Sequence, residues 1–325
     1  MTHSVKGTTQ IEMRSRVHYN LAVSKPFLAL LCLPLLMGGA CEKKPKNNGD
    51  TGAINALDRA EGDQGKAGPV DETPLSGIDV SALSADKQKL FYKLVDSLSS
   101  PCGKAHSLRT SFTQDTACKR APFAVRYVEA LLSDEASEAQ AREDYEKKYK
   151  HTGEPVKIDV SKAPRVGNED APIRLVEFFD YQCPHCQAFK PMLEAVSHAN
   201  DGKVVEYFMM FPLEKHQDSK SASMAAVAAN RLGKFEQMHE ILFARSPQHS
   251  KDAVIGYAKE IGLDPAQFET AYNAAAAQVA SDIDQGDSLG VDSTPTLFFN
   301  DRKYEGPFHP KYIQMWIDEE LAVNR

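Results

Sequence analysis

The sequence predicts an α/β fold in which helices cover a mixed sheet, preceded by a small helical module. Two observations predict it. Residues 79–150 carry apolar side chains at helical spacing, and from about residue 156 short strand-like segments alternate with helical ones. The 325 residues are 42% hydrophobic and 26% charged, enough for one large or two modest domains. The net charge of −7 argues against nucleic acid as a partner.

Residues 1–41 have the profile of a signal peptide. Basic residues precede the uncharged apolar run "FLALLCLPLLM", residues 27–37. As a helix this run rises only about 16 Å, too short for a bilayer core of about 30 Å. The segment ends in "MGGAC", which resembles the lipobox of bacterial lipoproteins, although Gly38 stands where leucine is usual. The resemblance implies that Cys41 carries a lipid that anchors the chain to a membrane; a plain secretory cut after Ala40 is the alternative.

Either processing route puts the mature chain outside the cytoplasm, in a bacterial envelope and facing the periplasm. Cysteine pairs there are interpreted as disulfides before metal sites. Residues 42–78 are rich in Gly, Pro, Asn, Asp and Lys and have few large apolar residues, so they predict a flexible tether.

The helical module, residues 79–150, begins with the segment "ADKQKLFYKLVDSLSS", in which apolar residues recur at helical spacing. Residues 121–150 suggest two more helices, punctuated near Ser133. Cys102 and Cys118 lie in the connection after the first helix. A structural disulfide between them would contribute about 3 kcal/mol by closing a loop. A second redox pair that exchanges electrons with the rest of the chain is an alternative, and a metal site a weaker one.

The alternating part of the chain is predicted element by element. "VKIDV" (156–160), "IRLVEFF" (173–179) and "KVVEYFMMF" (203–211) are typical of strands, and residues 184–196 of an amphipathic helix. A long helical region follows, about residues 217–288. "PTLFFN" and "RKYEG" then predict a strand pair, and "PKYIQMWIDEEL" a closing helix.

Two cysteines, Cys183 and Cys186, occur where the strand at residues 173–179 gives way to the helix, in the motif CPHC. Pro184 occupies the first helical position, where a missing N–H costs nothing. The helix start exposes the first sulfur, and its positive end favours the thiolate, which is the reactive form. Cys186 lies within one turn of Cys183 and is expected to be more covered. His185 can add positive charge or a donor near Cys183 and make the disulfide more oxidising.

The stretch "DAPIRLVEFFDYQCPHCQAFKPMLEAV" resembles the DsbA-like thiol:disulfide oxidoreductases of the thioredoxin superfamily. The likeness continues through "FPLEKH" and "GVDSTPTLFFN" to the last helix and covers residues 156–325. It implies a thioredoxin-like fold with a helical insertion. It also implies that Cys183 is the nucleophile and Cys186 the resolving thiol. Gln182 departs from ordinary thioredoxins, which have tryptophan there.

The resemblance bears on four further residues. Pro295 would be a cis-proline that packs beside the disulfide and helps to bind substrate backbone, with Thr294 before it. Thr294 also occurs in relatives that reduce or isomerise disulfides. Glu177 matches a buried acid that relays protons during exchange, and burial would raise its pKa; the alternative is a strand-end acid that faces solvent. His216 also matches a recurring family position, but a solvated histidine at a helix start is an equal alternative.

We therefore expect an envelope protein-disulfide oxidoreductase that exchanges disulfides with secreted proteins, with dithiol oxidation favoured. No cofactor is expected beyond the redox-active disulfide Cys183–Cys186. The expected partners are protein thiols and disulfides, a membrane redox protein, and the membrane itself through the N-terminal lipid. A reductase or isomerase fed by a membrane electron donor is the alternative enzyme. A thioredoxin-fold module that binds a metal or a partner is a third hypothesis.

Overall fold

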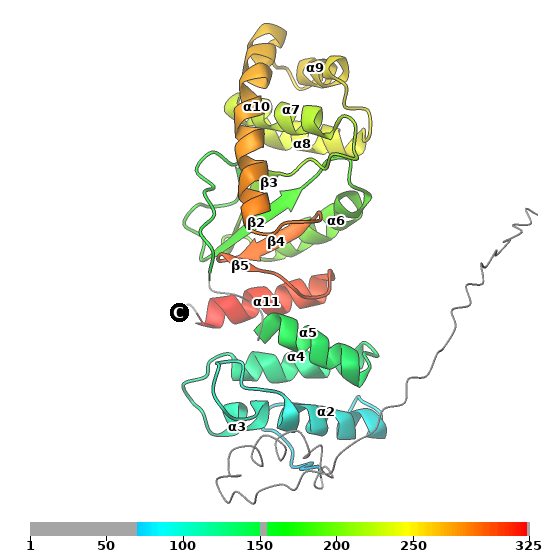
Figure 1. Cartoon of the computed structure of the whole chain (residues 1–325), viewed down its shortest axis with the longest axis vertical. Coiled ribbons are helices and arrows are strands. Elements are labelled where there is room, and N and C mark those ends of the chain that lie inside the picture. The colour runs from blue at the N-terminus through cyan, green and yellow to red at the C-terminus, as the bar shows by residue number, and fades with distance from the viewer. Residues whose placement is uncertain (1–69, 150–154, 324–325) are drawn as a thin grey trace, which may run out of the picture. The chain divides into compact units, whose positions relative to one another are not determined.

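The computed structural model describes residues 70–149 and 155–323 (Figure 1), all of which fall within the unit Lys66–Arg325. The predicted signal peptide, the lipidation candidate Cys41 and most of the predicted tether lie outside the described residues. Among the residues that are described, none of the helices is both long enough and apolar enough to span a bilayer.

A five-stranded sheet with the order β1-β3-β2-β4-β5 forms the centre of the C-terminal part of the chain. β2 and β3 are parallel and are joined through a helix, whereas the other neighbouring strands pair antiparallel. The predicted α/β class and its thioredoxin-like sheet are therefore confirmed. The strands are β1 (Arg165–Val166), β2 (Ile173–Phe179), β3 (Val204–Met210), β4 (Thr296–Phe299) and β5 (Arg302–Lys303).

One strand prediction is wrong. Residues 156–160, "VKIDV", pair with no strand, because their amides find other partners: Val156 N donates to Asp301 O at 2.8 Å and Asp159 N to Gln285 Oε1 at 2.8 Å. The edge beside β3 is instead taken by β1, whose two residues have no alternating pattern.

Helices cover both faces of the sheet, and each face forms its own hydrophobic core with the helices that cover it. α6 (Pro184–Ala199) and α11 (Pro310–Val323) pack on the face that carries Leu175 and Leu297, and α10 (Pro265–Ser288) packs on the face that carries Phe178. Successive residues of β2 alternate between these faces, which is the period of a strand. Glu177 therefore points to the same side of the sheet as Leu175, towards α6.

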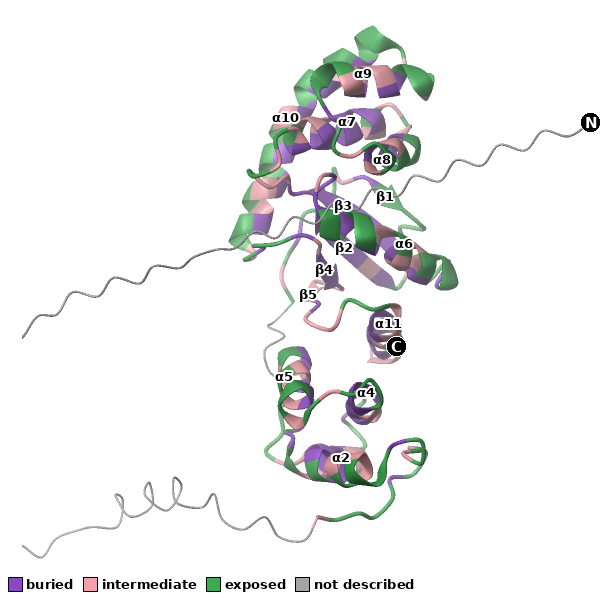
Figure 2. Cartoon of the chain, turned by 90° about the vertical axis from the view of Figure 1, so that its right-hand side faces the viewer, coloured by how far each residue is buried: buried purple, intermediate pink, exposed green. Residues whose placement is uncertain are grey.

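The helical region predicted at 217–288 consists of four helices: α7 (Ser219–Arg231), α8 (Phe235–Ala244), α9 (Lys251–Glu260) and α10. Figure 2 shows buried residues concentrated in α7 and the strands, with exposed residues on the outer sides of the surrounding helices. The core of this insertion continues into the end of β2 and includes Phe179, Cys183 and Cys186. The two cysteines therefore lie where the sheet meets the insertion.

The helical module contains α2 (Ala85–Ser97), α3 (Leu108–Thr113), α4 (Ala121–Ser133) and α5 (Glu138–Tyr149). Cys102 and Cys118 form a disulfide that brackets α3, a short helix that the sequence pattern did not reveal. Leu75, within the predicted tether, is only 4% exposed and packs in the core of the module.

The module contacts α11 through buried ion pairs. Arg120 lies 2.6 Å from Glu319, and Lys148 lies 2.9 Å from the same carboxylate. Tyr312 of α11 adds its ring to the module's core and donates to Asp134 at 2.8 Å.

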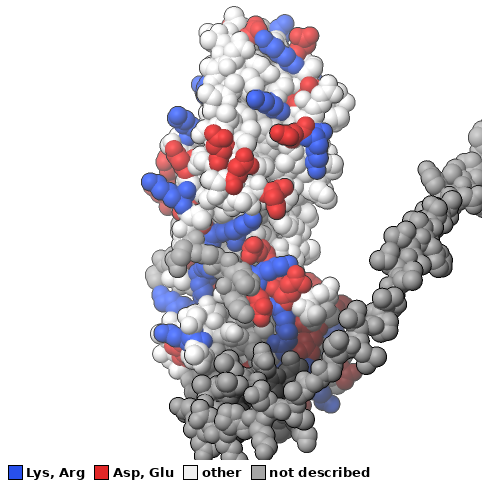
Figure 3. Space-filling view, in the orientation of Figure 1, with Lys and Arg blue, Asp and Glu red and all other residues white. Residues whose placement is uncertain are grey.

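On the face that Figure 3 shows, acidic and basic side chains are interspersed among the described residues that are visible.

Gly286 lets α10 approach the sheet, which gives a first prediction. A Cβ there would stand 2.5 Å from the ring of Phe211 and 3.2 Å from that of Phe178. We expect Gly286→Ala to lower the free energy of unfolding by about 1–3 kcal/mol in chemical denaturation, because the core would be overpacked. Gly256→Ala in α9 is the control: a Cβ there meets nothing within 4 Å, so it should stabilise by about 0.5–1 kcal/mol. Equal effects of the two substitutions would contradict the close approach.

Candidate active site

The candidate site is built at the turn from β2 into α6. β2 ends at Phe179, and Cys183 is the N-cap residue of α6, with backbone angles φ −74° and ψ 120°. Pro184 takes the first helical position, and no side chain caps the amides of the first turn. The amide of Cys183 itself donates to Asp180 O at 3.1 Å, and this hydrogen bond closes the turn between β2 and α6. The sulfur is thereby held at the end of the helix that carries partial positive charge.

Strand register brings the second part of the site beside the first. Thr296 of β4 pairs with Phe178 of β2, so the residues before β4 lie next to the residues after β2. The Thr294–Pro295 peptide bond is cis, as the resemblance implied. Cys183 Sγ donates to Thr294 O at 3.4 Å. The sequence thus predicted the two segments, and pairing of β2 with β4 joins them.

Both thiols are free and buried, with Cys183 3% and Cys186 1% exposed. The expectation that the helix start exposes the first sulfur is therefore wrong for this conformation. The carbonyl of Thr294 stands over it, and the core of the helical insertion packs around both cysteines. His185 between them is exposed, so the part of the motif open to solvent is Pro184–His185.

Burial sets the chemistry of the second cysteine. It raises the pKa of the Cys186 thiol strongly, and the nearby carboxyl of Glu177 raises it further. Two contacts act in the opposite direction: the backbone of Asp180 and the side chain of Thr294 stabilise the thiolate. In the reduced form seen here, Cys186 is therefore held as a thiol, whereas Cys183 lies at the helix end.

Glu177 is buried at 6% exposure, which excludes the alternative of a strand-end acid in solvent. Desolvation raises the pKa of its carboxyl well above the ordinary value, and the negative charges of Glu206 and Glu194 add to this effect. Lys190 acts against it. The structure therefore places a carboxyl that favours its neutral form within electrostatic reach of Cys186.

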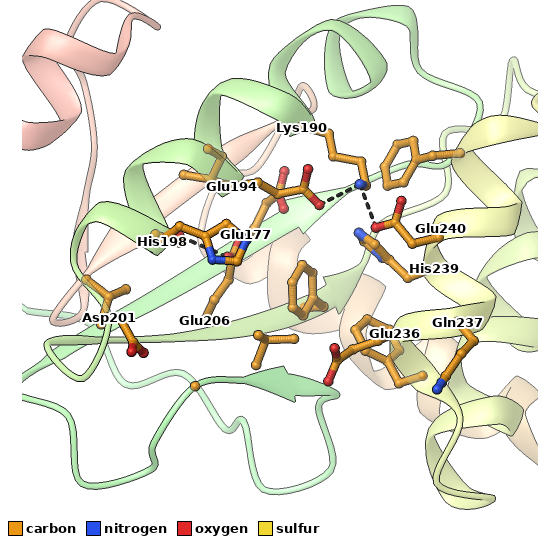
Figure 4. A pocket seen from close by; sticks show the side chains of 18 residues that line it. Glu177, Lys190, Glu194, His198, Asp201, Glu206, Glu236, Gln237, His239 and Glu240 are labelled. Carbon is orange, nitrogen blue, oxygen red and sulfur yellow. Dashed lines mark hydrogen bonds and ion pairs between the residues drawn. The ribbon is translucent and has the colours of Figure 1, made fainter.

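A cavity of about 500 Å³ opens on the α6 side of the sheet and reaches Glu177 (Figure 4). Glu177 comes from β2, Glu206 from β3, Lys190 and Glu194 from α6, and Glu240 from α8. Lys190 Nζ bridges Glu194 at 2.5 Å and Glu240 at 2.7 Å. Burial raises the pKa of Glu206 to about 7, despite a hydrogen bond from Ser197 Oγ at 3.3 Å.

Asp180, which the sequence analysis missed, holds the turn in place. It is fully buried, and its Oδ1 accepts hydrogen bonds from Gln182 N at 2.7 Å and from the hydroxyl of Ser219. Its Oδ2 accepts from Leu213 N at 2.9 Å and from His216 Nδ1 at 2.7 Å. His216 is therefore not the solvated histidine of the alternative interpretation. The sequence offered one hint that Asp180 holds this turn: it is an acidic residue between the apolar strand and the CPHC motif.

Gln182, which the sequence analysis noted only as a departure from ordinary thioredoxins, links the turn to the helical insertion. Its Nε2 donates to Pro247 O at 2.8 Å and lies 3.3 Å from His249 Nδ1. His249 is buried, and its Nε2 lies 2.7 Å from Leu242 O. With Nε2–H donating to that carbonyl, Nδ1 accepts from Gln182. Burial lowers the pKa of His249, which favours this neutral form.

Across residues 70–149 and 155–323, no three His, Cys, Asp or Glu side chains are arranged to hold a metal ion.

Residues 159–319 match the family model of thioredoxin. The Na(+)/H(+) antiporter NhaA 3 of Salinispora tropica is 31% identical over 174 residues, which are 52% of this chain and 26% of the antiporter. The chain thus spans about a quarter of the length of this curated relative. A thioredoxin-like oxidoreductase from Silicibacter pomeroyi DSS-3 is similar in structure, with 28% identity and a TM-score of 0.46 over 50% of this chain and 96% of that one. Oxidised BdbD from Bacillus subtilis has 25% identity and a TM-score of 0.47 over 52% and 97%.

The raised pKa of Glu177 predicts how stability depends on pH. The folded state keeps a proton that the unfolded chain releases above about pH 4.5, so stability falls as pH rises from that value through the folded-state pKa. Glu177→Gln removes this loss. We expect its advantage in free energy of unfolding over the wild type to grow by about 1.4 kcal/mol per pH unit across that window. Chemical denaturation between pH 4.5 and 8 measures it.

Glu236→Gln serves as the control, because Glu236 lines the same cavity but is exposed. It should leave the pH dependence of the wild type unchanged. A constant difference between Glu177→Gln and the wild type at every pH would show that Glu177 is not held protonated.

Proposed function

Because residues 159–319 of this chain belong to the thioredoxin family, we propose that it is a thiol:disulfide oxidoreductase that exchanges disulfides with secreted or envelope proteins. One observation carries the proposal. Two free thiols stand at the start of α6, beside the cis Thr294–Pro295 bond and in front of a buried carboxyl. A nucleophilic sulfur, a resolving thiol and a proton-holding group are the parts that disulfide exchange requires.

Oxidation of a substrate dithiol would begin with the Cys183–Cys186 disulfide. A substrate thiolate attacks Cys183 Sγ, the bond between the two cysteines breaks, and its electron pair leaves on Cys186 Sγ. Glu177 gives its proton to this sulfur, because burial favours the thiol form of Cys186. The second substrate thiolate then attacks the substrate sulfur of the mixed disulfide and releases Cys183 as thiolate.

The surroundings of Cys183 supply orientation. Pro295 and Thr294 lie beside the sulfur and would receive the substrate backbone, and the carbonyl of Thr294 already lies 3.4 Å from Cys183 Sγ. His185 is exposed next to the sulfur and would stabilise its thiolate by charge or by a donated hydrogen bond. Because Cys183 is covered in this conformation, binding of substrate must displace part of that cover.

An oxidising compartment fits the disulfide between Cys102 and Cys118, since such bonds persist in secreted and envelope proteins. We place the protein at a bacterial envelope, facing the periplasm and anchored through a lipid on Cys41. The two electrons that each oxidised client leaves on the cysteine pair must pass to a disulfide-bearing membrane redox partner. Edman sequencing and mass spectrometry of the mature N-terminus test the anchor.

The alternative enzyme is a reductase or isomerase that a membrane donor keeps reduced. Thr294 favours it, since the resemblance links threonine at this position to such relatives. The reduction potential of Cys183–Cys186 separates the two directions: about −120 mV is typical of a strong dithiol oxidant and about −270 mV of thioredoxin. A potential near the thioredoxin value would overturn the oxidising assignment and leave the exchange chemistry intact.

Cys183→Ser tests the nucleophile. We expect it to lose at least 1,000-fold in the rate of dithiol peptide oxidation and in insulin-disulfide reduction, because serine cannot form the mixed disulfide (about 4 kcal/mol or more). Ser99→Ala, in the helical module, is a control that leaves all cysteines in place. Full activity of Cys183→Ser would refute the proposal, and a wild type that never turns over dithiols would favour a binding module instead.

Cys186→Ser tests the resolving role and the order of the two sulfurs. Without Cys186 the mixed disulfide on Cys183 cannot resolve from the enzyme side, so a covalent adduct with a cysteine peptide should accumulate. Non-reducing mass spectrometry after incubation with an oxidised peptide detects it. Adducts formed equally well by Cys183→Ser and by Cys186→Ser would contradict the assignment of the nucleophile.

A further inference from the structure

The mechanism above uses Glu177 but leaves a second buried carboxyl unexplained. Glu206 is 7% exposed and lies on β3, the strand that runs parallel to β2. In the pairing register, Glu206 stands opposite Leu175 and Phe208 opposite Glu177. Leu175 and Glu177 share one face of β2, so the two glutamates are diagonal neighbours on the same face of the sheet. Figure 4 shows both side chains on the α6 side of the strands.

The two glutamates differ in their contact with the rest of the protein. Glu206 accepts one hydrogen bond, from Ser197 Oγ at 3.3 Å, whereas the described residues give the Glu177 carboxyl no hydrogen bond or ion pair. Lys190, the nearest cation on α6, is bound to Glu194 and Glu240. Neither buried carboxyl is therefore neutralised by a direct cation, and two uncompensated carboxylates on neighbouring strands cannot both ionise cheaply.

Their position also connects the active site with solvent. Glu177 acts electrostatically on Cys186, and both glutamates line the cavity of about 500 Å³ that opens between α6, β3 and α8. A cavity of this size, with several carboxyl and imidazole groups among its lining side chains, is roomy enough for water. Cys186 itself is 1% exposed, so its proton needs a route through other groups.

We propose that Glu206 is the second member of a proton-sharing carboxyl pair, which passes protons between Glu177 and the solvent of the cavity while Glu177 exchanges them with Cys186. This inference rests on the proposed thiol–disulfide exchange. When Cys186 leaves as thiolate, it takes the proton of Glu177, Glu177 regains a proton from Glu206, and Glu206 regains one from solvent. In the reverse direction the Cys186 thiol loses a proton along the same path. Glu206 acts through Glu177 and does not touch a sulfur.

Burial of both carboxyls and the negative charge of Glu206 beside Glu177 give the pair its proton affinity. Desolvation raises the pKa of both carboxyls, and the charge of Glu206 contributes to the rise at Glu177. Other titratable groups face the pair from each element packed against it. On α6 and its C-terminal turn they are Lys190, Glu194, His198 and Asp201, and on α8 they are Glu236, His239 and Glu240. Burial lowers the pKa of His239 to about 3, so this imidazole stays neutral in the neutral pH range.

Glu206→Gln tests the pair. The measured quantity is the rate at which dithiothreitol reduces the Cys183–Cys186 disulfide between pH 5 and 9, corrected for the ionisation of dithiothreitol. Loss of the repulsion from Glu206 should move the inflection that belongs to Glu177 to lower pH by about one unit. The second inflection of the coupled pair should disappear. Carbon-13 NMR titration of the glutamate carboxyls in the same variant reads the shift without any turnover.

Glu236→Gln is the matched control, since it removes one negative charge from the exposed rim of the same cavity. It should leave both the rate profile and the carboxyl titration of Glu177 unchanged. Equal shifts in Glu206→Gln and Glu236→Gln, or no shift in either, would overturn the pair. If Glu206→Gln does not fold, Ser197→Ala takes its place: loss of the hydrogen bond from Ser197 should raise the pKa of Glu206, and an unchanged titration would overturn the proposal.

The same measurements separate this inference from the proposed function. A wild type whose Cys183–Cys186 pair forms no reducible disulfide would refute both. A wild type that exchanges disulfides normally, with a Glu177 titration that ignores Glu206→Gln, would refute only the carboxyl pair.

Discussion

The geometry of the site depends on one buried carboxylate, that of Asp180. Its two oxygens accept hydrogen bonds from the turn itself, from the residues after β3 and from the first residue of α7. Its backbone carbonyl accepts from Cys183 N. A fully buried carboxylate is tolerated only while such donors surround it, because an unpaired charge in the interior costs several kcal/mol. The position of Cys183 is therefore coupled to the folding of segments up to residue 219.

Around this anchor the two cysteines experience opposite surroundings although only two residues separate them. Cys183 lies at the start of α6, near free backbone donors and the carbonyl of Thr294. Cys186 lies inside the first turn, where burial disfavours its thiolate and a negative charge on Glu177 would disfavour it further. In the exchange that we propose, this asymmetry would set a direction: Cys183 would meet the substrate, and Cys186 would receive the electron pair and then a proton. The asymmetry has two structural causes. Cys186 lies one helical turn after Cys183, and Glu177 lies on the face of β2 that α6 covers.

Local sequence patterns were sufficient to predict the strands, helices and loops that carry the site. The apolar run 173–179, the CPHC motif and the Thr-Pro dipeptide identified the strands and loops of the site. For Glu177 the sequence left burial and a solvent-facing position both open, and the structure decides for burial. The donors to Asp180 could not be predicted, because they lie up to 39 residues away and meet it only after β3 and α7 have packed. The two-residue β1 was missed for a different reason: no periodicity exists in so short a segment.

The helical module shows how a small unit is held beside the larger one. The disulfide Cys102–Cys118, with a sequence separation of 16, adds about 3 kcal/mol to the stability of the module on the chain-entropy model. Glu319 of α11 then receives Arg120 and Lys148 from the module, and the same helix packs its other residues, Ile313 and Trp316, onto the face of the sheet that α6 covers. Separating the module would remove Arg120 and Lys148 from Glu319. A buried charge that loses its partner destabilises the protein, so the separation would be costly. The free energy that orders α11 against the sheet is therefore shared with the module.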